Sequence, residues 1–321
     1  MPRIPIIIGP TAAGKTALAV EVALECDRRG LGTGEIISAD AFQVYRGMDI
    51  GTGKATEAER RGVVHHLIDL IEPDTPEPFT ARRWLTMCEQ TIEQIRTRGH
   101  VPIVVGGTHL YIKALVDGMF IGPGADEELR RNLEAMDPST RREELERIDP
   151  ASASRIHPND TRRTVRALEV HRLTGVPISE HQSQWDHQPR EDCVVIGLQW
   201  DAEAINGRIN RRVREMVDRG LVQEVRRLSP RLGPQARQAL GYKQILEHLE
   251  GTGTLEQAIE RTKIATRRYA KNQRTWLRRL RAGAPWLTVC PGLSNPQESA
   301  QHVVNTCLAR QDQASEPPGE E

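Results

Sequence analysis

Long apolar runs are absent from this sequence of 321 residues. No stretch reaches the roughly 18 consecutive apolar residues that a membrane-spanning helix needs. Residues 4–8 form an apolar run, but it is short and leads directly into Gly9. It therefore predicts a first strand and not the core of a signal peptide. We expect a cytoplasmic protein with no membrane partner.

Cysteine pairs, aromatic residues and net charge are also scarce. The sequence has no C-x-x-C pair, which disfavours a zinc site and a disulfide framework. Aromatic residues make up 4% of the chain, hydrophobic residues make up 38%, and the mean hydropathy is −0.52, as is typical of ordinary globular proteins. Because 44 basic residues balance 44 acidic ones, net charge argues neither for nor against a nucleic-acid partner.

Positive charge is concentrated in one part of the chain. Residues 202–281 contain 19 Lys and Arg against 8 Asp and Glu, and residues 261–281 contain nine basic residues and no acidic one. Tyr269 and Trp276 lie among these basic residues. The pattern is typical of a surface that binds a phosphate backbone, and a solvated helix face is the alternative interpretation.

Strands and helices alternate through the first part of the chain. Residues 4–9, 35–39 and 101–105 are short apolar runs that predict strands. Residues 16–25 and 81–98 repeat apolar positions at helical spacing. We therefore predict an α/β fold with a parallel sheet and helices on both of its faces.

The pattern changes at the turn-rich residues 122–124, after which strands disappear. We predict an α/β core at 1–123, a helical insertion at 124–191, a return of the core with basic helices at 192–310, and a disordered tail at 311–321. In the third segment, the predicted strands are 193–200 and 286–289. The predicted helices there are 204–219, 235–249, 254–280 and 296–309, the last capped by Asn295.

A phosphate-binding loop follows the first predicted strand. The pattern G-x-x-x-x-G-K-[ST] is matched by Gly9, Pro10, Thr11, Ala12, Ala13, Gly14, Lys15 and Thr16. The context of strand, loop and helix is what this P-loop requires, because its backbone N–H groups close around phosphate oxygens at a helix N-terminus. Lys15 adds a cation and Thr16 can bind Mg²⁺. The motif predicts a polyphosphate site of the kind found in ATP-binding and other nucleotide-binding proteins.

The acid that an ordinary nucleotide hydrolase uses is missing. Such an enzyme offers a strand that ends in Asp to hold Mg²⁺, whereas residues 101–105 are followed by Gly-Gly-Thr. The carboxylate that does follow a predicted strand is Asp40. It could ligate a metal through water, cap the next turn, or accept a proton from a substrate amine, and capping and catalysis fit its position equally well. Adjacent His65 and His66 do not present ligands on one face, so we do not predict a metal site there.

Further segments resemble one family. They are I-I-S-A-D-A-F-Q-V-Y-R-G-M-D-I-G-T from Ile36, H-H-L-I-D from His65, V-V-G-G-T-H-L-Y from Val104, R-I-H-P-N-D from Arg155, R-A-L-E-V from Arg166, A-L-G-Y-K-Q from Ala239 and T-R-R-Y-A-K-N-Q-R-T-W from Thr266. With the P-loop, they resemble the tRNA dimethylallyltransferases and follow the family's order. These isopentenyl transferases move a dimethylallyl group onto the exocyclic amine of the adenine just 3′ of the anticodon.

The resemblance implies roles for individual residues. It implies that the P-loop holds the diphosphate of dimethylallyl diphosphate with Mg²⁺ on Thr16, that Arg208 and Arg212 reach the same diphosphate, and that catalysis uses Asp40 as general base, Thr108 and Lys15. The tRNA anticodon stem-loop would contact Asp40, Ala41, Phe42, Gln43, Thr108, Arg130, Arg162, Arg163, Thr164, Val165, Arg166, Leu240, Gly241, Tyr242, Lys243, Gln244, Ile245, Asn272, Gln273, Arg274, Thr275, Trp276, Leu277, Arg278 and Arg279.

Two positions depart from the family pattern. Ala41 stands where the family usually has Ser, which removes a hydroxyl, and Asn272 stands where it usually has Arg, which removes one basic contact to RNA. Phe42, Tyr242 and Trp276 are candidate surfaces on which bases could stack, and a place in the core fits each of them as well.

Transfer of an allylic group leaves charge on a departing diphosphate, which is where the P-loop amides, Lys15 and Mg²⁺ are aimed. No nucleotide is hydrolysed in that reaction, which accounts for the missing acid. Two alternatives stay open: a small-molecule or nucleoside kinase that uses ATP, and a non-catalytic RNA-binding regulator with the P-loop as a switch. We expect the protein to act as a monomer.

Overall fold

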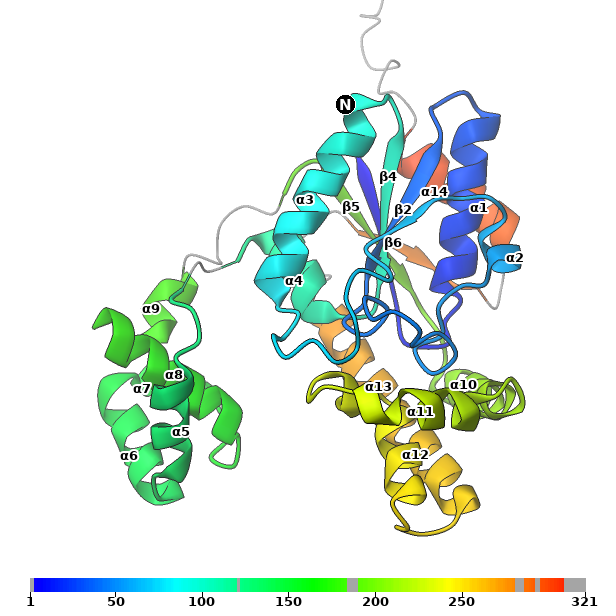
Figure 1. The fold of residues 1–321 in the computed structure, drawn as a ribbon. Coiled ribbons are helices and arrows are strands. Elements are labelled where there is room, and N and C mark those ends of the chain that lie inside the picture. The colour runs from blue at the N-terminus through cyan, green and yellow to red at the C-terminus, as the bar shows by residue number, and fades with distance from the viewer. Residues whose placement is uncertain (1–2, 120–121, 184–189, 281–285, 292–294, 309–321) are drawn as a thin grey trace, which may run out of the picture. The chain divides into compact units, whose positions relative to one another are not determined.

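The computed structural model of this chain describes residues 3–119, 122–183, 190–280, 286–291 and 295–308 (Figure 1). The chain forms two compact units. One contains Met1–Val116 and Arg190–Glu321, and the other contains Asp117–Pro189. The tail predicted to be disordered at 311–321 lies outside the described residues, and no described helix is long and apolar enough to cross a membrane.

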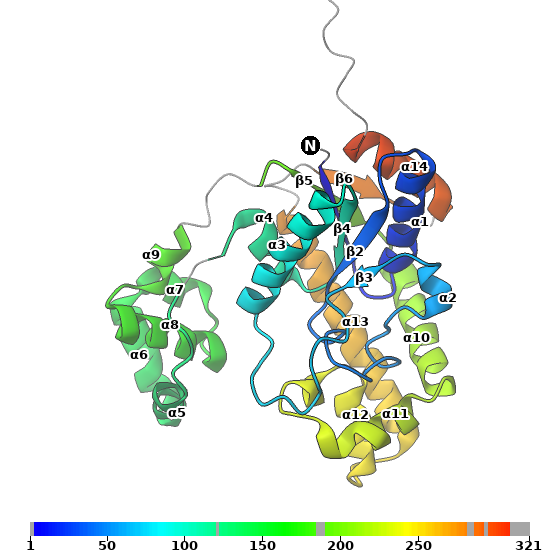
Figure 2. The ribbon, with the colours of Figure 1, turned by 45° about the horizontal axis from the view of Figure 1, so that its top comes forward.

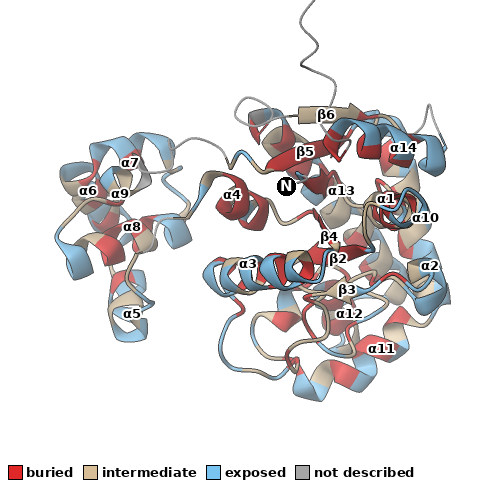
Figure 3. Cartoon of the chain, turned by 90° about the horizontal axis from the view of Figure 1, so that it is seen from above, coloured by how far each residue is buried: buried red, intermediate tan, exposed pale blue. Residues whose placement is uncertain are grey.

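The larger unit is built on a parallel sheet of six strands in the order β3-β2-β4-β1-β5-β6. The strands are β1 (Ile4–Ile8), β2 (Gly34–Ala39), β3 (His65–His66), β4 (Val101–Gly106), β5 (Cys193–Leu198) and β6 (Trp286–Val289). In the register, Ile6 pairs with Val104 on one side and with Val195 on the other. The central strands are buried along their whole length, as strands covered on both faces must be, and this is why they read as continuous apolar runs (Figure 3).

Helices cover both faces of this sheet, so the predicted α/β class is confirmed (Figure 2). Those of the larger unit are α1 (Lys15–Arg28), α2 (Glu57–Arg60), α3 (Ala81–Thr97), α4 (His109–Asp117), α10 (Ala202–Asp218), α11 (Leu221–Leu228), α12 (Tyr242–Leu249), α13 (Leu255–Leu280) and α14 (Pro296–Cys307). Helices α1 and α14 pack together against one face, and α3 covers the other (Figures 1 and 2). Helices α10 to α13 lie beyond the carboxyl ends of the strands, where sites of open α/β sheets assemble.

The smaller unit is helical. It consists of α5 (Glu127–Ala135), α6 (Pro138–Ile148), α7 (Pro150–Arg155), α8 (Thr161–Thr174) and α9 (Ile178–Ser183). Four of these helices begin at an Asp whose carboxylate accepts hydrogen bonds from first-turn N–H groups, namely Asp126, Asp137, Asp149 and Asp160. Leucine and valine side chains from α5, α6 and α8 form its core.

The structure differs from the sequence prediction in several places. The single helix expected at 235–249 is divided into two parts: the short 3-10 segment Ala236–Gln238 ends where Ala239 leaves helical geometry, and α12 begins only after Gly241, which has φ +90°. Helices α2, α4 and α11 were not predicted. Strand β3 was missed because it has only two residues, and it is held at the sheet edge by pairing with β2 and by a bond between the His66 ring and the Glu35 carboxylate.

Candidate active site

The P-loop lies between β1 and α1 and is fixed by side chains that are distant in sequence. Trp200 donates its ring N–H to the Ala13 carbonyl at 3.0 Å, and the Arg208 Nε donates to the Ala12 carbonyl at 2.7 Å. The Arg208 guanidinium lies 4.6 Å from the centre of the Trp200 ring. Since the Ala13 carbonyl and the Gly14 N–H share a peptide plane and point in opposite directions, this bond turns the Gly14 N–H away from Trp200.

A buried glutamine completes the support of the loop. The side chain of Gln273, only 1% exposed, accepts the Thr11 N–H at 2.7 Å and donates to the Gly107 carbonyl at 2.9 Å. It therefore ties α13 both to the P-loop and to the turn after β4. The resemblance implies an RNA contact for Gln273, and in this structure its side chain is buried with both ends of its amide bonded to the backbone.

Lys15 and Arg212 bring positive charge to this loop. The Lys15 Nζ donates to the carbonyls of Gly9 and Pro10 at 3.2 and 3.0 Å. The pKa of Lys15 is lowered to about 8 by burial and by the nearby Arg212, while Asp40 acts in the opposite direction. Among the described residues, the Arg212 guanidinium has no hydrogen-bond or ion-pair partner, and burial lowers its pKa while Asp40 raises it. These two cations are suited to an anionic ligand.

Asp40 lies at the carboxyl end of β2, where one carboxylate oxygen caps the following turn. Its Oδ1 accepts the N–H groups of Phe42 and Gln43 at 2.9 and 3.2 Å. Thr108 follows β4 beside it, and its hydroxyl accepts the Ala41 N–H at 3.1 Å. Capping uses only Oδ1, and no described residue bonds to Oδ2. The capping and catalytic interpretations of Asp40 are therefore compatible.

Two cavities of about 530 and 520 Å³ meet at this point. The first extends from the P-loop along Arg208, Arg211 and Arg212. The second is lined mainly by α10, α13 and residues 238–241, which precede α12. Five residues line both: Thr11, Asp40, Thr52, Arg212 and Met216. A ligand phosphate at the P-loop and a base in the second cavity would thus meet beside Asp40.

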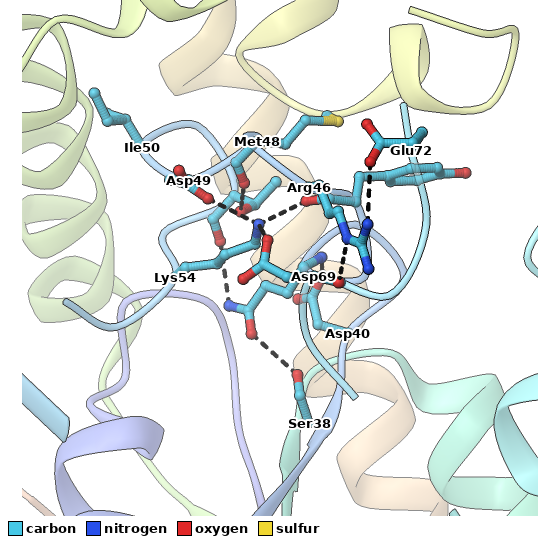
Figure 4. Close-up of polar contacts among 12 residues, drawn as sticks. Ser38, Asp40, Arg46, Met48, Asp49, Ile50, Lys54, Asp69 and Glu72 are labelled. Atoms are coloured by element: carbon cyan, nitrogen blue, oxygen red, sulfur yellow. Dashed lines mark hydrogen bonds and ion pairs between the residues drawn. The ribbon is translucent and has the colours of Figure 1, made fainter. Parts of the chain in front are cut away.

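Thr52 belongs to a loop, residues 48–54, that separates the two cavities and is held by buried polar groups. The Lys54 Nζ donates to the Tyr45 carbonyl at 2.6 Å and to the carboxylates of Asp49 and Asp69 at 2.8 and 2.5 Å (Figure 4). Gln43 reaches the same loop from beside Asp40, where its side chain accepts the Ser38 hydroxyl at 3.0 Å and donates to the Thr52 carbonyl at 3.4 Å (Figure 4).

Glu224 on α11 holds the other side of the loop of residues 48–54. Its buried carboxylate accepts the backbone N–H groups of Asp49, Ile50 and Gly51 at 3.1, 2.8 and 3.0 Å, and also the Tyr242 hydroxyl. Tyr242 is completely buried, so of the two alternatives for this aromatic residue the structure selects the core. Neither Glu224 nor Lys54 was singled out from the sequence, because an isolated Glu or Lys carries no local signal of such contacts.

Some of the residues predicted to contact RNA in the larger unit line the second cavity, and the others differ in how far they are buried. Those that line the second cavity are Asp40, Ala41, Phe42, Thr108, Leu240, Gly241 and Asn272. Thus both departures from the family pattern, Ala41 and Asn272, line one cavity. Lys243 and Arg278 are exposed, while Gln244, Ile245 and Leu277 are buried. Arg274, Thr275 and Trp276 are half-buried, and the side chain of Arg279 lies outside the described residues.

Trp276 and His109 form the one aromatic stack that the described residues show near the second cavity. The Trp276 ring stacks on His109, with the ring centres 6.0 Å apart and the planes inclined by 15°. Burial lowers the pKa of His109 to about 4, and the Lys15 charge contributes, so this ring is neutral at neutral pH. The stack is half-buried, so the structure leaves part of Trp276 accessible.

The smaller unit contains the other predicted RNA contacts. Arg162 and Arg163 are exposed, and Thr164 and Val165 are buried. Arg130 and Arg166 both bind the Glu169 carboxylate, which is 0% exposed, at 2.9 and 2.5 Å. Their guanidinium groups are therefore held in place by a buried anion. The chemistry of this pair is consistent with pre-organised phosphate contacts.

The larger unit thus combines a parallel α/β sheet, a P-loop, the cations Lys15 and Arg212, and the Asp40 carboxylate at the end of a neighbouring strand. This combination defines a transferase-type polyphosphate site. The sequence model of the IPP transferase family matches residues 43–280, and that of the isopentenyl transferase family matches residues 2–74. The chain belongs to the tRNA dimethylallyltransferase family.

Individual relatives agree with this assignment. The tRNA dimethylallyltransferase of Pelotomaculum thermopropionicum is 44% identical over 88% of this chain and 90% of the relative. That of Geobacillus kaustophilus is 44% identical over 86% of this chain and 87% of the relative.

Two solved structures are also similar. A tRNA isopentenylpyrophosphate transferase from Bacillus halodurans is 38% identical, covers 95% of both chains and has a TM-score of 0.67. A eukaryotic dimethylallyltransferase acting on tRNA is 29% identical, covers 95% of this chain and 78% of its own, and has a TM-score of 0.79.

Proposed function

We propose that this protein transfers a dimethylallyl group from dimethylallyl diphosphate to the N6 amine of the adenine 3′ of the anticodon in tRNA. The observation that carries the proposal is the meeting of two cavities beside Asp40, one lined by the P-loop and arginines and the other by residues predicted to contact RNA. A donor and an acceptor can enter from different sides and react where the cavities join. Membership of the family supports the choice of donor and acceptor.

The donor diphosphate lies in the first cavity. The first-turn N–H groups of α1, Lys15 and Arg212 face the negative charge that grows on the departing diphosphate. Thr16 lines this cavity, and its hydroxyl bonds to no described residue, so it fits as a ligand of Mg²⁺. Mg²⁺, when bound there with the diphosphate, neutralises part of the leaving-group charge.

The acceptor adenine lies in the second cavity, out of its stack with neighbouring bases. Its N6 nitrogen forms a bond to the allylic carbon as the carbon–oxygen bond breaks, and the electron pair of that bond leaves with the diphosphate. The proton lost from N6 moves to Asp40, whose Oδ2 is not used in capping. Thr108 positions this centre, since its hydroxyl holds the backbone just after Asp40.

The surrounding chain supplies the rest of the reaction's needs. The anticodon stem-loop is bound by exposed basic residues of both units, such as Arg162, Arg163, Lys243 and Arg278. We infer that the protein acts as a monomer, and the substrate tRNA implies the cytoplasm. A kinase would need none of these basic surfaces, and a non-catalytic regulator would not need Asp40 where the cavities meet.

Transfer of labelled donor tests this function. Purified protein, Mg²⁺, unmodified tRNA and dimethylallyl diphosphate labelled in the allyl group are expected to give labelled tRNA, while labelled ATP stays intact. Asp40→Asn should lower kcat at least 100-fold with tRNA affinity nearly unchanged, on the scale of general-base catalysis. Lys15→Ala should abolish donor use and leave tRNA binding. Consumption of ATP, or full activity of the Asp40 variant, would refute the proposal.

A further inference from the structure

One face of α10 carries charged side chains near the P-loop and an apolar side chain one helical turn further along. Arg208, Arg212 and Met216 are spaced four residues apart and lie on one face of the helix. Arg208 bonds to the P-loop itself at Ala12, and Arg212 lies beside Asp40. Met216 follows one turn further, about 6 Å along the helix axis from Arg212. This face therefore offers cations first and a thioether side chain next.

Met216 occupies the place that a transferred group must pass. Of the five described residues that line both cavities, it is the only hydrophobic one, and the other four are Thr11, Asp40, Thr52 and Arg212. Its side chain is half-buried, so part of it faces the cavities. Ile209 and Val213, on the neighbouring face of α10, are 0% and 3% exposed and line the second cavity alone.

The wall behind Met216 leaves it little freedom to move away. A Cβ atom placed on Gly53 would lie 3.4 Å from the Met216 terminal methyl and 1.8 Å from an Arg212 nitrogen. The backbone of Gly53 therefore packs directly against both side chains. The loop of residues 48–54 is in turn held by Lys54 and Glu224. Its backbone therefore limits the space into which the Met216 side chain can move.

We propose that Met216 contacts the prenyl group of the donor and limits its length. The inference rests on the proposed function, because it assigns a selectivity role within the same site. A diphosphate held at Lys15 and Arg212 places a five-carbon branched chain next to Met216, one helical turn beyond the cations. A longer prenyl chain meets the Met216 side chain and the Gly53 backbone behind it.

Substitution of Met216 tests this role with two donors, dimethylallyl diphosphate and geranyl diphosphate. Met216→Ala is expected to raise the ratio of kcat/KM for geranyl over dimethylallyl diphosphate at least 10-fold, since a few methylene groups in an apolar pocket change discrimination by roughly this factor. Met216→Leu, of similar volume, should keep the ratio within about three-fold of the wild type. Met216→Phe should instead lower kcat/KM for dimethylallyl diphosphate, with tRNA affinity unchanged.

Met87→Ala is the matched control, since this methionine lies on α3 outside both cavities. It should change neither ratio nor rate. An unchanged ratio in Met216→Ala, together with unimpaired dimethylallyl transfer by Met216→Phe, would overturn the inference alone. A wild-type protein that transfers no prenyl group to tRNA would overturn the proposed function and this inference with it. If Met216→Ala does not fold, the fall in kcat/KM for dimethylallyl diphosphate expected of Met216→Phe decides.

Discussion

Replacement of Glu224 by Gln should destabilise the wall between the two cavities. The Glu224 carboxylate accepts four hydrogen bonds. Its Oε2 accepts the N–H groups of Asp49 and Ile50, and its Oε1 accepts the Gly51 N–H and the Tyr242 O–H. A glutamine side chain has one acceptor oxygen, so in either orientation two of the four donors face an NH₂ group. These two donors would be left buried without an acceptor.

The expected cost follows from those two donors. An unsatisfied buried donor costs about 1–3 kcal/mol, so Glu224→Gln should lower the free energy of unfolding by about 3 kcal/mol after some relaxation of the loop. Tyr242→Phe removes a single bond and leaves the three backbone bonds in place, so it should cost about 1–2 kcal/mol. Equilibrium unfolding in urea, followed by circular dichroism, measures both values.

Glu250→Gln is the control for the loss of a carboxylate. Glu250 forms an exposed ion pair with Arg237, and such pairs contribute about 0.5 kcal/mol or less. The loop of residues 48–54 contributes Gly53 and Lys54 to the first cavity, Gly51 to the second and Thr52 to both. Glu224→Gln should therefore also raise KM for donor and tRNA, which Glu250→Gln should not. If the free energies of unfolding of Glu224→Gln and Glu250→Gln differ by less than about 0.5 kcal/mol, the Glu224 bonds to the loop do not stabilise the protein as argued.

Two further predictions concern the P-loop. Burial and Arg212 lower the pKa of Lys15 to about 8, so its charge is lost as pH rises through that value, and kcat/KM for the donor should fall above about pH 8. Arg212→Gln should move this fall to higher pH, and a profile that stays level to pH 10 would contradict the assignment. Gln273→Leu leaves the Thr11 N–H without its acceptor and should lower the free energy of unfolding by about 2 kcal/mol and raise KM for the donor. The same change at exposed Gln301 of α14 should do neither, and equal effects of the two substitutions would show that the Gln273 bridge is unimportant.

The sequence by itself determined the elements that local patterns encode. The P-loop lies between β1 and α1 as predicted, and the runs at 101–105 and 193–200 form central strands, because strands covered on both faces need continuous apolar residues. Asp40 could be placed at a strand end for the same reason. Short elements and interruptions of helices were harder to predict from the sequence. The break before α12 at Gly241 and the two-residue strand β3 are examples.

Only the tertiary structure decided which residues meet. Gln273 reaches the P-loop from 262 positions away, and Glu224 reaches Gly51 from 173 positions away. Neither contact has a local signature, since a side chain's partner depends on how the sheet and helices pack and not on the residues beside it in sequence. The same packing moved Tyr242 from a candidate base-stacking surface into the core, and it brought Arg212 and Met216 to the place where the two cavities join.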